Sequence, residues 1–268
     1  MFVLNDQSGT PWQNYHFLVC MFNRLKTEGH IVEIDNSPFN YGVSRMRQYL
    51  ADKSIKRGYE FILRLDDDVI LKPDYIEKLM KVIDQGFDLA TGATPFIGQS
   101  HFKRESRFIQ PVGNMIIFDQ QGNYIFNGDD FGIEYYDESI LPVHHFRSCA
   151  LYKSKFHQRG VNYTPTRLSK HGFREEQLFS YKAILAGFKL GCNTKAIAYH
   201  LLTPSGGERF ANSDELIKLN QEVLENETKY LFETHGNFIE DYNKRMGIQI
   251  PNLTQEDLLK ETNLAKLK

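Results

Sequence analysis

The segment Phe61-Ile-Leu-Arg-Leu-Asp66-Asp67-Asp68 decides the fold class, because an apolar run ends there abruptly in three carboxylates. Pro73 follows a few residues later and opens an amphipathic segment, and proline is well tolerated in the first turn of a helix. We therefore expect a strand over residues 61–65, a short turn and then a helix. Open α/β sheets bind ligands beyond the carboxyl ends of their strands, which is where this arrangement puts the acids.

Asp66 and Asp68 are expected to point to one side of the extended chain and Asp67 to the other, because side chains alternate along a strand. Two carboxylates on one side suit a hard divalent cation, and such a cation mainly holds phosphate oxygens. Acidic turns after strands are also common without any ligand. The pattern alone therefore leaves a purely structural explanation open.

Short apolar strands and amphipathic helices alternate through the first third of the chain. This alternation predicts right-handed β-α-β units in an α/β protein whose mixed, mostly parallel sheet is flanked by helices. Besides the strand and helix around Asp66, we expect strands near residues 3–4, 31–34 and 89–92, and helices over about 13–28 and from Gly42 to near Gly58.

The second half of the chain departs from this alternation. Residues 112–118 and 124–126 are predicted to form a hairpin. A helix is expected from Glu175 to Gly187, then a strand that ends at His200, then amphipathic helices from about residue 212. Two acids at a helix start also simply complement the helix dipole, and a lone histidine is usually structural.

Composition excludes several classes of protein. The 268 residues carry a net charge of -2 and no basic run, so nothing favours nucleic acid binding. The apolar stretches are too short to span a bilayer, and the start has no signal-peptide pattern. Three scattered cysteines without a Cys-x-x-Cys spacing favour a cytoplasmic protein, with a peripheral position at the membrane left open. Dehydrogenase, P-loop and zinc-protease motifs are absent from the sequence.

The ordered motifs resemble those of family-2 glycosyltransferases of the GT-A fold. The motifs are Asn5-Asp6-x-Ser8, Asn40-x-Gly42 with Arg47, Leu65-Asp66-x-Asp68, Phe173-Arg-Glu175-Glu176, and His200. The resemblance covers residues 1–210. It implies a Rossmann-like GT-A domain with a nucleotide-binding half, 1–92, and an acceptor and catalytic half, 93–210, followed by a helical C-terminal extension, 211–268.

The resemblance also implies roles for single residues. Asp68 would be the direct ligand of Mn²⁺ or Mg²⁺, and His200 would complete the metal or diphosphate site. Glu176 would be the general base, with Glu175 as its acidic neighbour. Contacts to the nucleotide sugar would come from Asp6, Gly42, Arg47, Asp66 and Asp67. In addition, we expect the positively charged side chain of Arg209, at the end of a predicted loop, to face the diphosphate of the donor.

The function implied by the resemblance is metal-dependent transfer of a sugar, with inversion, from a nucleotide sugar to an acceptor hydroxyl. A UDP-sugar is favoured as donor, and a carbohydrate or a lipid-linked molecule as acceptor. A nucleotidyltransferase of Rossmann-like fold is the alternative enzyme. The family normally opens with a strand that precedes the one ending at Asp6, and its absence would leave ladder groups unpaired in the middle of the sheet. A truncated, non-catalytic nucleotide- or carbohydrate-binding remnant is therefore a third reading.

Overall fold

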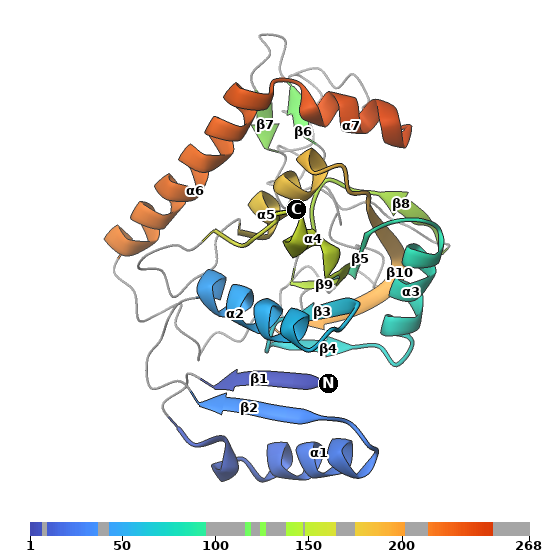
Figure 1. Ribbon diagram of the computed structural model, residues 1–268, viewed down its shortest axis with the longest axis vertical. Coiled ribbons are helices and arrows are strands. Elements are labelled where there is room, and N and C mark those ends of the chain that lie inside the picture. Colours follow the sequence, from blue (N-terminus) through green and yellow to red (C-terminus); the bar gives the residue numbers. More distant parts are fainter. Residues whose placement is uncertain are drawn as a thin grey trace, which may run out of the picture.

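The computed structural model describes residues 1–6, 10–36, 43–94, 116–118, 124–126, 138–146, 148–164, 175–201 and 214–248. Its architecture is a central mixed sheet flanked by helices, with further helices at the C-terminal end (Figure 1). The first elements along the chain are β1 (Phe2–Asp6), η1 (Trp12–Asn14), α1 (His16–Thr27), β2 (Val32–Asn36), α2 (Val43–Lys56), β3 (Phe61–Leu65), β4 (Val69–Leu71), α3 (Tyr75–Asp84) and β5 (Leu89–Ala93). They are followed by β6 (Ile116–Phe118), β7 (Tyr124–Phe126), β8 (Ile140–Pro142), β9 (Cys149–Lys153), α4 (Lys155–Gln158), α5 (Glu175–Leu185), β10 (Leu190–His200), α6 (Asp214–His235) and α7 (Phe238–Met246).

The main sheet has the strand order β3-β9-β5-β10-β4, and β8 also pairs with β10. The prediction of a mostly parallel sheet is wrong in one respect, because most strand pairs of the main sheet are antiparallel. β9 lies between β3 and β5 and runs antiparallel to both, whereas β5 and β10 are parallel. β9 was not predicted from the sequence, because the strand is buried along almost its whole length and so shows no alternation of apolar and polar residues.

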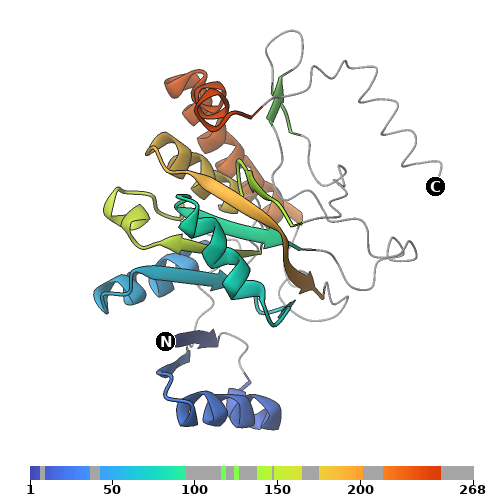
Figure 2. The ribbon, with the colours of Figure 1, turned by 90° about the vertical axis from the view of Figure 1, so that its right-hand side faces the viewer.

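The N-terminal part forms a separate two-stranded sheet in which β1 and β2 are parallel. In the described part of the chain, β1 pairs only with β2, and β3 pairs only with β9. Within the described residues, no strand pairing therefore joins the small sheet of β1 and β2 to the main sheet. β1, β2 and α1 lie at one end of the long axis, and α6 and α7 lie at the other end (Figures 1 and 2).

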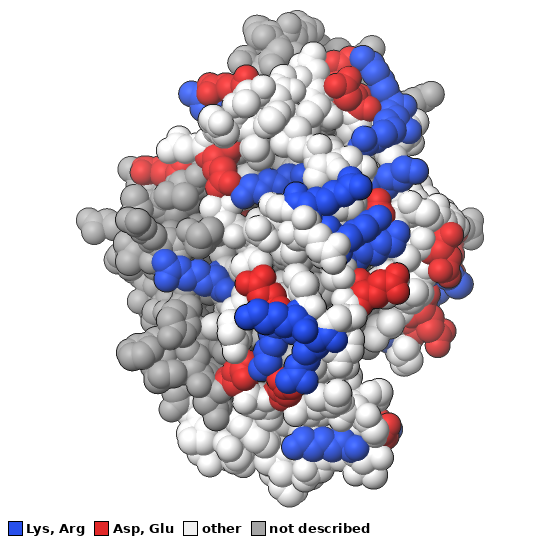
Figure 3. All heavy atoms as spheres, viewed as in Figure 1, with Lys and Arg blue, Asp and Glu red and all other residues white. Residues whose placement is uncertain are grey.

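Helix α2 connects this small sheet to the main one, since it contacts both β1 and β3. Lys53 of α2 pairs with Glu33 and Asp35 of β2 at 2.8 Å each, and Arg57 also pairs with Glu33. Lys and Arg are likewise interspersed with Asp and Glu across the face in Figure 3. The ion pairs of Lys53 and Arg57 join α2, the helix that carries Arg47, to β2 of the small sheet.

The two faces of the main sheet are covered by different helices. On one face, Tyr75, Leu79 and Val82 of α3 are buried against the strands. On the other, a larger cluster joins α5 to the C-terminal helices, including Phe179 and Tyr242. The Tyr242 hydroxyl donates to the Val143 carbonyl and accepts from the Leu190 amide, both at 3.0 Å. The C-terminal helices therefore share a core with α5, the helix that begins with the acidic pair.

Two other expectations concern the periphery. β6 and β7 pair antiparallel, which confirms the predicted hairpin in its described residues. The predicted amphipathic helices after about residue 212 are confirmed as α6 and α7, and the chain breaks between them at Gly236. Residues 112–115 and those after 248 lie outside the described part of the chain.

Candidate active site

The acids after β3 are brought to His200 by the pairing of β4 with β10. The chain turns at Asp67 and Asp68 and enters β4, whose Val69 is opposite His200 in the antiparallel register. The Leu201 amide donates to the Asp68 carbonyl at 2.8 Å, which closes the ladder beyond the last pair. As a result, His200 Nε2 lies 3.5 Å from Asp68 Oδ1.

Asp66, Asp68 and His200 form a group that could hold a metal ion. One potential ligand atom from each lies within 4.8 Å of the others; His200 is buried and the two carboxylates are partly buried. Two carboxylates and an imidazole are a donor set that fits a divalent cation, and the imidazole favours Mn²⁺ over Mg²⁺, which prefers oxygen ligands. Asp67 is exposed and is not part of this group.

The acidic pair at the start of α5 faces the same region. Glu175 is 2% exposed, and its Oε1 contacts Arg47 of α2. Glu176 Oε1 accepts hydrogen bonds from Arg64 Nη2 at 2.7 Å and from Arg47 Nη1 at 3.1 Å. Glu175 is therefore buried against an arginine, whereas Glu176 keeps 17% of its side chain exposed and can meet a ligand.

The same two arginines connect the acidic pair to Asp66. Asp66 Oδ1 accepts from Arg64 Nη2 at 2.6 Å and from Arg47 Nη2 at 2.8 Å. Burial raises the pKa of the Asp66 carboxyl, and the Arg64 guanidinium opposes that rise. A cation would have to share Asp66 with these two guanidinium groups.

Two residues of the site were missed by sequence analysis. Arg64 could have been found as a charged residue inside an apolar strand, two positions before Asp66 and hence on the same side. Ser148 left no comparable signal. It has a positive φ of 47°, which is strained for a residue other than glycine, and its carbonyl accepts from the Asp66 amide at 3.1 Å.

Three predicted site residues cannot be placed relative to this cluster. Gly42 and Arg209 lie outside the described residues. Asp6 ends β1, and its side chain is also outside the described part. Those the structure brings together are Arg47, Asp66, Asp68, Glu175, Glu176 and His200.

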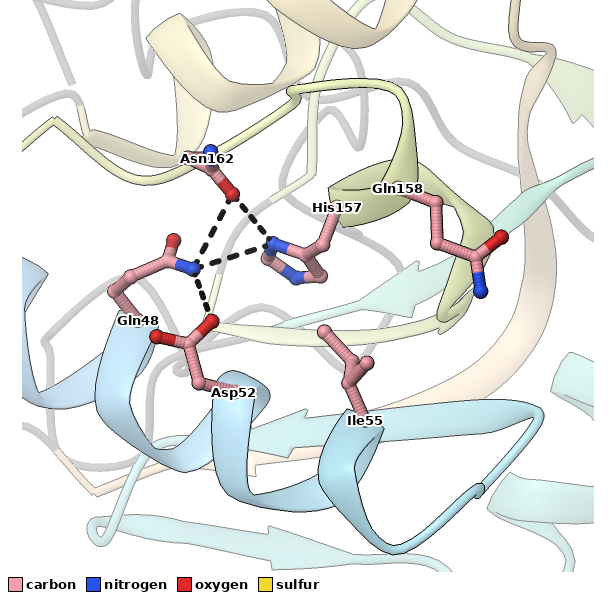
Figure 4. A pocket seen from close by; sticks show the side chains of 6 residues that line it. All are labelled: Gln48, Asp52, Ile55, His157, Gln158 and Asn162. Carbon is pink, nitrogen blue, oxygen red and sulfur yellow. Dashed lines mark hydrogen bonds between the residues drawn. The ribbon is translucent and has the colours of Figure 1, made fainter.

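An open depression of about 470 Å³ lies between α2 and α4 with the segment that follows α4 (Figure 4). Gln48 Nε2 donates to Asp52 Oδ1 at 2.8 Å and to Asn162 Oδ1 at 3.2 Å, and Gln48 Oε1 accepts from the Tyr163 amide at 2.9 Å. Burial lowers the pKa of His157, which also lines the depression. These polar groups satisfy one another, so we interpret the depression as a structural junction that holds α2 in place.

Comparison with known proteins identifies the family. The model of glycosyl transferase family 2 matches residues 19–153, and the chain belongs to this family. A search of curated proteins found no significant match.

Solved structures resemble the fold at low sequence identity. The structure of GalNAc-T7 with UDP, GalNAc and Mn²⁺ matches with a TM-score of 0.56 and 15% identity, over 90% of this chain and 48% of that one. TarS 1-349 from S. aureus matches with a TM-score of 0.46 and 13% identity, over 74% of this chain and 50% of that one. This chain thus spans about half the length of either structure.

Within the described part of the chain, no helix combines the length and apolar character needed to cross a bilayer.

Proposed function

We propose that this protein transfers a sugar from a nucleotide-sugar donor, with a UDP-sugar favoured, to a hydroxyl group of a carbohydrate or lipid-linked acceptor. The observation that carries the proposal is the single cluster in which Glu176 is linked through Arg64 and Arg47 to the group Asp66, Asp68 and His200. Family membership and the likeness to GalNAc-T7, whose structure contains UDP and Mn²⁺, support it.

In this proposal, Asp68 and His200, with Asp66, hold a divalent cation, Mn²⁺ or Mg²⁺. When bound, the cation supplies charge compensation for the diphosphate leaving group. Glu176 Oε1 is occupied by two guanidinium groups, and no partner of Oε2 is found among the described residues. Oε2 is therefore the atom that accepts the proton.

The proposed reaction is a single displacement. Glu176 Oε2 takes the proton of the acceptor hydroxyl, whose oxygen bonds to the anomeric carbon. The bond from that carbon to the diphosphate oxygen breaks, and its electron pair leaves with the nucleoside diphosphate. Attack opposite the leaving group inverts the anomeric centre.

Glu176→Gln tests the role of the base, because it keeps the size and one oxygen of the side chain but cannot accept the proton. We expect turnover, measured as release of UDP from UDP-sugars with Mn²⁺, to fall by about 10²–10⁴-fold, with UDP affinity measured by calorimetry little changed. Glu240→Gln, at an exposed acid of α7, is the matched control. Turnover in Glu176→Gln equal to that of the unaltered chain would rule out this base. UDP binding by the unaltered chain without transfer from any UDP-, GDP- or dTDP-sugar would favour the non-catalytic reading.

A further inference from the structure

Arg64 is an unusual residue for its position, since it interrupts an otherwise apolar strand in the main sheet. Its side chain is only 7% exposed, and its guanidinium lies 5.4 Å from the centre of the Phe146 ring. Burying a guanidinium costs free energy unless carboxylates and hydrogen bonds compensate for the lost water. Arg64 Nε and Nη1 are buried and have no hydrogen-bond partner among the described residues. A residue that served packing alone would not need this charge.

The paired nitrogen of Arg64 joins two functional groups. Nη2 donates to Asp66 Oδ1 at 2.6 Å and to Glu176 Oε1 at 2.7 Å, so one atom connects the end of β3 to the start of α5. Arg47 contacts the same oxygens, but at 2.8 and 3.1 Å, and also contacts Glu175. Of the two arginines, Arg64 therefore makes the shorter hydrogen bonds to both Asp66 and Glu176.

We propose that Arg64 is a positioning residue that fixes the Glu176 carboxylate relative to Asp66, an inference that rests on the proposed function. By holding Oε1, Arg64 presents Oε2 toward the acceptor at a set distance from the donor held near Asp66. β3 is paired with β9 along its whole length, and this pairing holds the backbone from which the Arg64 side chain extends. Arg64 acts through Glu176 and touches neither the donor nor the acceptor.

The test uses Arg64→Met, which keeps an unbranched apolar stem but removes the guanidinium with its charge and donors, and Arg64→Lys. Misplacing a reacting group by about 1 Å can cost about 10²-fold in rate. We expect kcat of Arg64→Met to fall by about 10²-fold, with the KM for the UDP-sugar within about threefold of that of the unaltered chain. Arg64→Lys should recover part of kcat, because an ammonium restores the charge but not the planar fork. Arg159→Met is the control, since Arg159 also lies over an aromatic ring, that of Phe188 at 5.5 Å, but away from the acids.

A double variant separates positioning from a general loss of structure. If Arg64 acts through Glu176, adding Arg64→Met to Glu176→Gln should not lower kcat below that of Glu176→Gln alone. A further tenfold loss in the double variant, or an unchanged kcat in the folded single variant, would overturn the proposal. If Arg64→Met does not fold, Arg64→Lys decides: a folded lysine variant with full kcat contradicts positioning, and a reduced kcat at constant KM supports it. Absence of transfer by the unaltered chain would instead remove the proposed function, and the positioning role with it.

Discussion

Arg47 and Arg64 reach the same two carboxylates from different elements, α2 and β3. Together with Glu175 they form a buried or partly buried cluster in which two guanidinium groups face three carboxylates. Removing one member of such a cluster leaves an uncompensated charge, which is costlier than replacing a pair. Single substitutions in this cluster must therefore be read with a stability measurement beside the activity.

Gly92 is the residue at which the packing of the sheet has least tolerance. A Cβ built there would lie 2.1 Å from the Ala196 carbonyl oxygen and 2.8 Å from the Ala196 Cβ, at the register shift between β5 and β10. Since backbone atoms cannot swing aside, we expect Gly92→Ala to lower the free energy of unfolding by about 1–3 kcal/mol in urea denaturation. The displaced β10 also carries His200, so Mn²⁺ affinity should fall as well. An unchanged denaturation midpoint would show that β5 and β10 are not in such close contact.

At the scale of elements, Glu138 attaches β8 to α3 and β10. Its carboxylate accepts from Asn193 Nδ2 at 2.9 Å and pairs with Lys78 at 3.2 Å and Lys81 at 3.3 Å. These partners lower the pKa of Glu138 to about 2, with the hydrogen bond from Asn193 as the largest cause. Glu138 thus fixes the point at which the chain returns to the sheet before β8.

The lowered pKa of Glu138 predicts a specific pH dependence. A group with a lowered pKa contributes stability above its ordinary pKa of 4.5, and this contribution is lost as the pH falls toward about 2. We expect Glu138→Gln to lower Tm at pH 6–7 and to have a much smaller effect near pH 2, by differential scanning fluorimetry. Glu77→Gln, at an exposed acid on α3, is the control. An equal loss of Tm for Glu138→Gln at both pH values would argue against the ion pairs.

Elements were predictable where the sequence carries a clear signal, either apolar residues at a regular spacing or an apolar run that ends abruptly in acids. Elements without such a signal were not predictable. β3 was expected with its observed bounds because it ends abruptly in acids, and α3 because its apolar residues recur at helical spacing. β4 and β9 were missed, since one is only three residues long and the other is nearly continuously buried. These two strands pair with β10 and β3, and so determine which groups approach Asp66 and Asp68.

Across the whole molecule, the sequence identified most of the acids of the site but not the contacts that join them. Asp66, Asp68, Glu176 and His200 were named from motifs, and the structure brings them into one cluster. The role of Arg64 depends on an α5 residue more than a hundred positions away, a separation across which local patterns carry no information. The C-terminal helices were expected as an extension, yet they contribute to the core behind α5.

The central claim is that Asp68 and His200, with Asp66, hold a cation that binds the diphosphate of the donor. The most direct measurement is calorimetry of UDP binding with and without Mn²⁺, in the unaltered chain, in Asp68→Asn and in Asp84→Asn, an exposed acid at the end of α3. We expect Mn²⁺ to strengthen UDP binding at least about tenfold, or about 1.4 kcal/mol, in the unaltered chain and in Asp84→Asn, and not in folded Asp68→Asn. Mn²⁺-dependent binding of equal strength in Asp68→Asn would contradict the account.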